Sequence, residues 1–254
     1  MTNSCLLAAT ATRPEVEAFV ADCPFAILPV GSTEQHGPHL PLDTDNRIAE
    51  RIAWETARRS AGLVLPTLPI GYAWVWTGVP GTLTLRFDTY RAMIRDIAES
   101  LESWDIKAVF VMSGHGANPQ VIKHAIREEI HGRSNIKVLN GLYSGIDAML
   151  AEADSEQWHN DIHAEEIETS LMLAIAPDLV HMDRAAPDYP DVPADYGKSE
   201  LSMGHMMRSG VFGDPTVATA EKGHRWIALA AERSAELWLS FLTRHGLRPP
   251  DPIE

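Results

Sequence analysis

Five acidic and imidazole side chains gather in a short stretch near the start of the chain: Glu34, His36, His39, Asp43 and Asp45. Glycines and prolines between them favour sharp, stiff turns. In an extended backbone, Glu34 and His36 would point to the same side. Imidazole nitrogen and carboxylate oxygen are the ligands that first-row divalent metals take in proteins. This density of ligand groups predicts a metal site, although each of these residues alone is more often an ordinary solvated loop residue.

The elements on either side of this stretch must position it. An apolar run at residues 25–30 predicts a buried strand that ends just before it. Apolar residues at helical spacing in residues 46–57 predict a helix just after it. Asp45 therefore lies close to a helix N-terminus, where a carboxylate is favoured even without a metal.

A second candidate ligand, His115, follows the clearest buried strand of the chain, residues 108–112. Gly114 and Gly116 flank it, and a helical pattern begins at Val121, so the segment is a strand, a glycine-rich turn and a helix. This is close to a dinucleotide fingerprint, but Pro119 replaces its third glycine and His115 occupies the place of an approaching pyrophosphate. We favour His115 as a metal ligand and keep a nucleotide-binding or regulatory module as a non-enzymatic alternative.

A third group of ionisable residues lies at 163–168, where His163, Glu165, Glu166 and Glu168 precede the apolar residues 171–174. The pattern predicts a helix that is buried, and buried carboxylates require partners or metals.

The order of elements predicts an α/β fold, a three-layer α/β/α sandwich with a mostly parallel central sheet. Further helices are predicted at residues 12–20, 90–104 and 219–244, and further strands at 63–65, 68–70 and 136–139. No internal repeat or linker is visible, so we expect a single domain over residues 1–254.

Composition narrows the class of partner. The net charge of -14, with no cluster of Lys and Arg, argues against nucleic acid and favours a small-molecule substrate. Two cysteines do not make a disulfide scaffold, which fits a cytoplasmic protein. No apolar window approaches the roughly 18 residues that indicate a membrane span, so we expect no membrane partner.

Tyr72, Trp74 and Trp76 lie between glycines, outside any helical period. Aromatic residues in such a segment serve either as a pocket wall or as packing in a core or oligomer contact.

The sequence as a whole resembles the creatininase (creatinine amidohydrolase) family. The resemblance rests on residues 31–41 followed by Asp45, and on four further motifs in order: residues 80–83, 114–118, 163–170 and 213–223.

This resemblance implies a creatininase-like three-layer fold, two divalent metal ions per subunit and frequently a hexamer built from dimers, hence a homo-oligomer. By matched position, one metal would be held by Glu34, Asp45 and His115. The other would be held by His36, Asp45 and Glu166, with Asp45 bridging. In creatininase proper the last carboxylate comes from the turn after the matched histidine. That turn has Gly116 and Ala117 here, so Glu166 is expected to take the role.

The charges of such a centre balance, because two divalent ions, three carboxylates and one bridging hydroxide sum to zero. The mixed nitrogen and oxygen ligands suit Zn, Mn or Fe. Water activated between two metals hydrolyses a C–N amide bond readily. His163 is our candidate for proton transfer to the leaving nitrogen, and we expect it to be catalytic together with Glu166. Glu168 is expected to orient a ligand, and His39 and Asp43 to be supporting or structural.

The substrate is expected to contact the aromatic residues Tyr72, Trp74, Trp76 and Trp158. An aromatic wall favours a small, cyclic amide. Family members also include a hydrolase that opens the carbon ring of a diketo-inositol of the 3-dehydro-scyllo-inosose type, which is the alternative reaction. A serine hydrolase is not supported, because the chain has no G-x-S-x-G motif.

Overall fold

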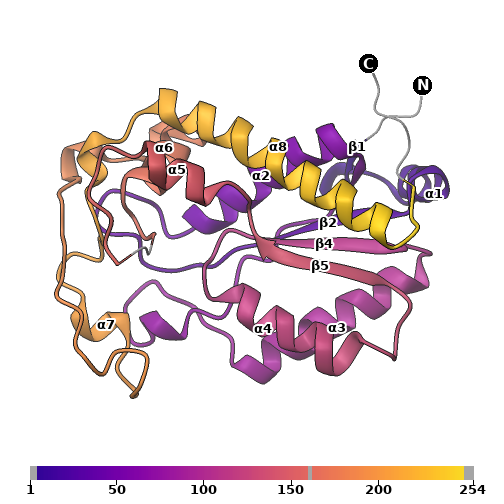
Figure 1. Ribbon diagram of the computed structural model, residues 1–254, viewed down its shortest axis with the longest axis horizontal. Helices are drawn as coiled ribbons and strands as arrows, with labels where there is room; N and C mark the ends of the chain where they lie inside the picture. The colour runs from indigo at the N-terminus through magenta and orange to yellow at the C-terminus, as the bar shows by residue number, and fades with distance from the viewer. Residues whose placement is uncertain (1–4, 160–161, 249–254) are drawn as a thin grey trace.

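Five parallel strands form the central sheet of the computed structural model, which describes residues 5–159 and 162–248 (Figure 1). The spatial order is β1-β3-β2-β4-β5, and every neighbouring pair is parallel. The strands are β1 (Cys5–Leu7), β2 (Phe25–Val30), β3 (Gly62–Val64), β4 (Ala108–Ser113) and β5 (Lys137–Leu142). The predicted α/β fold with a largely parallel sheet is confirmed.

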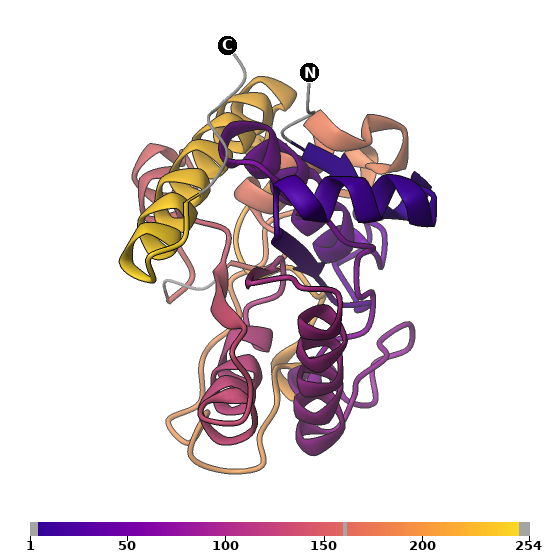
Figure 2. The ribbon, with the colours of Figure 1, turned by 90° about the vertical axis from the view of Figure 1, so that its right-hand side faces the viewer.

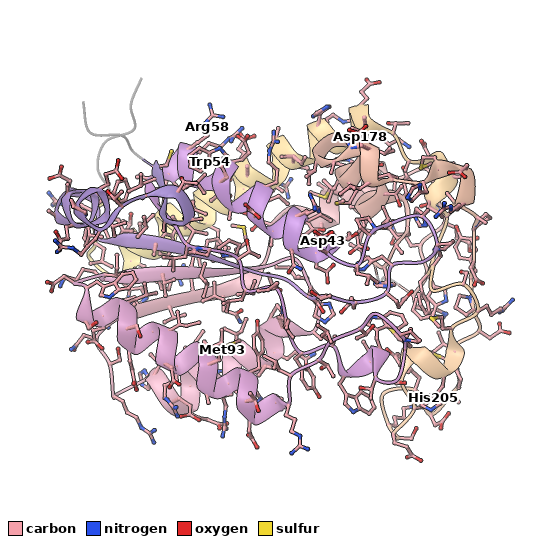
Figure 3. The ribbon with its side chains drawn as sticks, turned by 180° about the vertical axis from the view of Figure 1, so that it is seen from behind. Asp43, Trp54, Arg58, Met93, Asp178 and His205 are labelled. Atoms are coloured by element: carbon pink, nitrogen blue, oxygen red, sulfur yellow. The ribbon has the colours of Figure 1, made fainter. Side chains whose placement is uncertain are left out.

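Helices cover both faces of the sheet (Figures 1 and 2). On one face α2 (Thr44–Ser60), α6 (Glu166–Ile175) and α8 (Ala220–Arg244) pack against one another. On the other face lie α3 (Phe87–Ser103) and α4 (Asn118–His124), which continues into a π-helical segment, η3 (Ala125–Ile130). Figure 3 shows Trp54 of α2 and Met93 of α3 on opposite sides of the sheet. The remaining helices are α1 (Arg13–Asp22), α5 (Ile146–Glu152) and α7 (Met203–Met206), with short 3-10 turns at Ala8–Thr10, Trp74–Trp76, Pro177–Leu179, Met182–Arg184 and Pro215–Val217.

The two central strands are buried along their whole length. Alternate side chains of β2 and β4 belong to two separate cores: Phe25, Ile27 and Phe110 pack with α2 and α8, whereas Leu28 and Val111 pack with α3 and α4. Because both faces are covered, these strands are continuously apolar, which is why their sequence predicted them so clearly.

Parts of the fold differ from the sequence-based prediction. The strand expected at 68–70 is only a single bridge between Leu68 and Val30. The edge strand β1 and the short helix α5 were not predicted, because three or seven residues carry too little periodic signal.

The carboxyl ends of β2 and β4 lie side by side, since Val30 pairs with Ser113. From there the chain leaves in opposite directions, through α2 to β3 and through α4 to β5. Such a switch point forms a crevice at the ends of parallel strands. The start of α2 closes tightly on it: a Cβ on Gly114 would lie 2.2 Å from the Asp45 carbonyl oxygen.

Candidate metal centre

Six buried side chains converge at this end of the sheet. Their nitrogen and carboxylate oxygen atoms form three overlapping groups, each with all its atoms within 4.8 Å of one another. The groups are Glu34 with His36 and His163, Glu34 with Asp45 and His115, and His36 with Asp45 and Glu168.

Asp45 lies at the centre of the cluster, in the first turn of α2. Its Oδ1 is 3.0 Å from His36 Nε2, and its Oδ2 is 3.2 Å from His115 Nδ1. Burial by itself raises the pKa of this carboxyl, but the two imidazoles outweigh burial and hold the pKa well below its usual value. Asp45 is therefore an anion placed between two histidines, as a bridging ligand would be.

His36 and His115 each turn a free nitrogen toward the carboxylates. The other ring nitrogen contacts a backbone carbonyl, with His36 Nδ1 3.1 Å from Glu34 O and His115 Nε2 3.1 Å from Tyr72 O. A carbonyl can only accept, so these nitrogens carry the hydrogen in the neutral ring and the opposite nitrogens keep a lone pair. Without a cation the lone pairs face anions: burial lowers the pKa of His36, but Asp45 and neighbouring glutamates raise it to about 10.

Glu34 is held by one oxygen and leaves the other unsatisfied. Its Oε1 accepts a hydrogen bond from Trp76 Nε1 at 2.8 Å. Glu34 Oε2 and Asp45 Oδ2 are buried and make no hydrogen bond within the described residues. Both oxygens lie 3.2 Å from His115 Nδ1. Buried carboxylate oxygens beside imidazole lone pairs fit a divalent cation.

The acidic residue that α6 brings to this cluster is Glu168, not Glu166. Glu168 Oε2 lies 3.6 Å from His36 Nε2 and accepts the Ala164 N–H at 2.6 Å. Burial raises the pKa of Glu168 to about 8, although His36 opposes the shift. Ala164 has a φ of 52°, a left-handed conformation that is uncommon for alanine and marks the turn between His163 and α6.

The side chain of Glu166 turns away from the other ligands. Its Oε1 lies 2.6 Å from Lys222 Nζ, and its Oε2 accepts the Ser155 N–H at 2.7 Å. Both carboxylate oxygens of Glu166 therefore have partners outside the cluster. The structure thus does not bring Glu166 next to His36 and Asp45, where the sequence-based model expected it as a ligand of the second metal.

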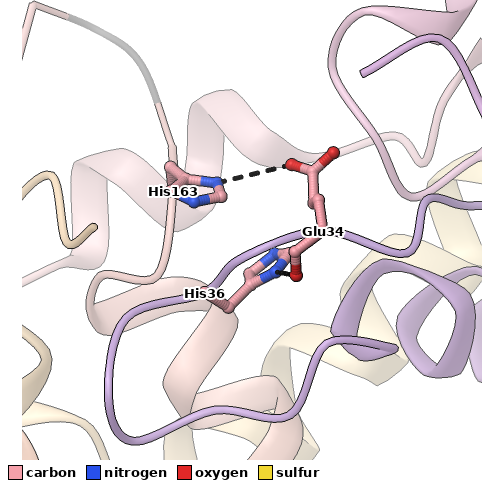
Figure 4. Close-up of side chains that lie close together, drawn as sticks. All are labelled: Glu34, His36 and His163. Atoms are coloured by element: carbon pink, nitrogen blue, oxygen red, sulfur yellow. Dashed lines mark hydrogen bonds and ion pairs between the residues drawn. The ribbon is translucent and has the colours of Figure 1, made fainter. Parts of the chain in front are cut away.

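His163 lies between two aromatic rings above the cluster. Its ring centroid is 4.5 Å from those of His36 and Trp76, and its Nδ1 is 3.8 Å from Glu34 Oε1 (Figure 4). The remaining two loop residues are elsewhere: His39 is buried with Nε2 2.9 Å from Thr169 Oγ1, and Asp43 pairs with Arg47 at the surface.

Known proteins match most of this chain. The family model for creatininase, creatinine amidohydrolase, matches residues 9–238. The chain belongs to the creatininase family.

Relatives within the family differ in their named activity. The chain is 34% identical over 217 residues to the mycofactocin precursor peptide peptidase of Mycobacterium ulcerans, covering 81% of this chain and 80% of the relative. It is 30% identical over 244 residues to the creatinine amidohydrolase of Pseudomonas putida, covering 89% and 93%. Creatininase structures described as a zinc–zinc mutant form and as a manganese form each align with a TM-score of 0.81, at 27% and 26% identity, over 92% and 93% of this chain and 97% and 98% of theirs.

The four aromatic residues expected to contact substrate lie in different environments. Trp76 is 1% exposed, and its Nε1 donates a hydrogen bond to Glu34 Oε1. Trp158 is also buried, and its Nε1 donates to Pro190 O at 2.6 Å. Tyr72 stacks edge-on against Phe87, while Trp74 is 39% exposed. Of these four, Trp74 offers the most surface to a ligand.

Two residues of this region, Glu168 and Gln35, were not predicted from the sequence at the places where the structure has them. Glu168 was expected to support a ligand from outside the cluster, and Gln35 was not singled out. Residues 166 and 168 lie about 200° apart around a helix, on either side of the buried Ile167, so the apolar pattern alone does not choose between them. Gln35 has no chemistry of its own to attract notice, but it stands between two candidate ligands.

Proposed function

We propose that this family member is a metal-dependent amidohydrolase that cleaves the C–N bond of an amide. One ion would be held by Glu34, Asp45 and His115. The second would be held by His36, Asp45 and Glu168. The observation that supports this most strongly is the match between two imidazole lone pairs and two buried, unpartnered carboxylate oxygens.

The three carboxylates of this set carry the same charge as those in the sequence-based proposal, with Glu168 in place of Glu166. Bound divalent ions would offset three buried negative charges, which are otherwise costly. The nitrogen and oxygen ligands suit Zn, Mn or Fe, and the zinc and manganese creatininases favour the first two. When bound, such ions lower the pKa of water and polarise a carbonyl group.

The surrounding residues would keep the ligands in place and assist the substrate. The Trp76 indole restrains Glu34 through one oxygen, and the Ala164 N–H restrains Glu168. Hydrogen bonds of this kind orient metal ligands. His163 is the buried imidazole of the cluster that this ligand set leaves unassigned, so we place it beside the reacting carbonyl.

The substrate class we propose is an amide, first a small cyclic one. The two named relatives act on a peptide and on creatinine, and both names describe amide cleavage. A peptide terminus is thus the second form of amide to test. Trp74 is our candidate for the contact that distinguishes them.

A turnover screen tests the proposal. Protein loaded with Zn or Mn, and the same protein after chelation, would be offered cyclic amides, formamides, short peptides and a diketo-inositol. We expect at least one amide to be hydrolysed only by the loaded protein. Full turnover after chelation would contradict the metal mechanism. Ring opening of the diketo-inositol without cleavage of any amide would contradict the proposed substrate class and favour the diketo-inositol as substrate.

We propose a homo-oligomer, a hexamer by family resemblance, in the cytoplasm. Within the described residues, the helices are all too short or too polar to cross a bilayer.

A further inference from the structure

Gln35 stands between two proposed metal ligands in sequence, yet its side chain serves His163. The amide Oε1 accepts the Gly37 N–H at 3.0 Å. The amide Nε2 lies 3.2 Å from Gly210 O and 2.7 Å from His163 Nε2.

These partners leave one orientation for the amide. The Gly37 N–H can only donate, and the Gly210 carbonyl can only accept, so Oε1 and Nε2 cannot be exchanged. The two hydrogens of Nε2 then go to Gly210 O and to His163 Nε2. His163 Nε2 must accept, and in a neutral imidazole the hydrogen is then on Nδ1.

The backbone is built around this amide. Gln35 is 7% exposed. Gly210 has a φ of +86°, and a Cβ there would lie 1.8 Å from Gln35 Oε1. Only glycine at position 210 leaves room for the amide at this distance. The close packing and the hydrogen bonds to Gly37 and Gly210 together hold the Gln35 side chain in place.

The hydrogen-bonding pattern of His163 is therefore the reverse of that of the two proposed ligand histidines. His36 and His115 give their N–H to backbone carbonyls and turn a lone pair to the cluster. His163 gives its Nε2 lone pair to Gln35 and keeps its hydrogen on Nδ1, the atom 3.8 Å from Glu34 Oε1.

We propose that Gln35 is a positioning residue that fixes His163 as a neutral imidazole with its proton on Nδ1. His163 then donates a hydrogen bond to the substrate carbonyl oxygen as negative charge develops there. The catalytic part rests on the proposed function, whereas the position of the proton does not.

Nitrogen-15 NMR of histidine-labelled protein tests the position of the proton directly. The variant His163→Gln identifies the signals of His163. In wild-type protein, metal-free and metal-loaded, we expect Nδ1 to be protonated and Nε2 to be bare. In Gln35→Glu the carboxylate accepts from Nε2, so we expect Nε2 to become protonated. Gln35→Met removes the donor while keeping the length of the side chain, and should give a mixture of the two neutral forms.

Gln120→Glu, the same change on the exposed face of α4, is the matched control and should leave the His163 signals unchanged. In the loaded enzyme we expect Gln35→Glu to lower kcat about 100-fold or more at unchanged metal content. A wild-type His163 protonated on Nε2, or ring signals that ignore both Gln35 variants, would overturn the proposal. Loss of amide hydrolysis in every preparation, with the expected NMR pattern, would overturn the proposed function and not the role of Gln35 in placing the proton.

Discussion

The hydrogen-bond partner of each buried histidine decides what that side chain can do. A backbone carbonyl on one ring nitrogen prepares the other to bind a cation, as in His36 and His115. A side-chain amide on Nε2 prepares Nδ1 to donate, as in His163. Three chemically identical rings within one cluster are thus prepared for two different proposed roles by groups that do not react.

Glu168 and Glu166 form a matched pair for substitution. Both are buried acids on α6, but one faces His36 and the other Lys222. We expect Glu168→Gln to lower metal content and to reduce kcat/KM by about 100-fold or more, because a charged ligand is lost. Metal analysis and turnover measure both effects.

Glu166→Gln should keep its metal but lose stability. Lys222, with a side chain only 14% exposed, would lose its buried partner but keep Asp154, whose Oδ2 lies 2.6 Å from Nζ, so we expect a loss of roughly 1–3 kcal/mol. Urea unfolding measures this loss. If Glu166→Gln loses metal while Glu168→Gln retains it, our choice between the two acids is wrong.

His39 predicts a pH dependence of stability. Burial, with a smaller contribution from His36, lowers the pKa of His39 to about 4. Its unfolded value is about 6.5, so the unfolded chain binds more protons between these values. The neutral form of His39 therefore contributes its whole share of the free energy of unfolding above pH 6.5, and this share is lost as the pH falls toward 4. We expect His39→Gln to flatten that fall, while the same change at exposed His131 should not.

The sequence could indicate most of the single residues of the site, but not their partners. Glu34, His36, Asp45 and His115 follow strand ends and carry ligand chemistry. The Tyr72 carbonyl and the Trp76 indole are contributed by a distant irregular segment, and no local pattern records that they reach His115 and Glu34.

Among the elements, β2, β4 and α2 do most to position the ligands. The strands present two loops at adjacent ends, and the first turn of α2 places Asp45 between them. Gly114 permits this approach, because a side chain there would collide with backbone. The space between Gly114 and the Asp45 backbone is too small for even one methyl group.

Gly114→Ala and Gly116→Ala test that tolerance. A Cβ on Gly114 would lie 2.2 Å from Asp45 O, whereas a Cβ on Gly116 has nothing within 4 Å. We expect Gly114→Ala to cost about 1–3 kcal/mol or more and to reduce turnover about 100-fold by displacing Asp45. Gly116→Ala should change neither substantially. Equal effects of the two substitutions on unfolding and turnover would argue against this packing constraint.

The long elements could be predicted from the sequence because each carries a repeated physical signal. β2 is apolar throughout, β4 is apolar up to its last residue, Ser113, and α8 repeats its buried residues over 25 residues. The bridge at Leu68, strand β1 and the left-handed turn at Ala164 depend on neighbours far along the chain. Which acid of α6 faces His36 likewise depends on packing and not on the local sequence pattern.

At the scale of the whole molecule, the fold concentrates negative charge in its interior. Glu34, Asp45 and Glu168 are at most 5% exposed, in a chain whose net charge is already -14. Such burial opposes folding unless cations or protons accompany it. The metal ions would therefore stabilise the protein as well as activate its substrate.

Metal should accordingly raise the unfolding temperature. A ligand that binds only the folded state adds about 2.7 kcal/mol when its free concentration is 100 times its Kd. We expect Zn or Mn to raise Tm by several degrees in the wild-type protein and much less in Asp45→Asn. Calorimetric scans with and without chelator measure the difference, and an identical rise in Asp45→Asn would place the stabilising metal elsewhere.

Anomalous diffraction from crystals loaded with Zn or Mn tests the two-metal site most directly. We predict two peaks per chain, one among Glu34, Asp45 and His115 and one among His36, Asp45 and Glu168. A fully loaded crystal without those peaks, or with its metal at Glu166 instead, would contradict the site on which the proposed hydrolysis depends.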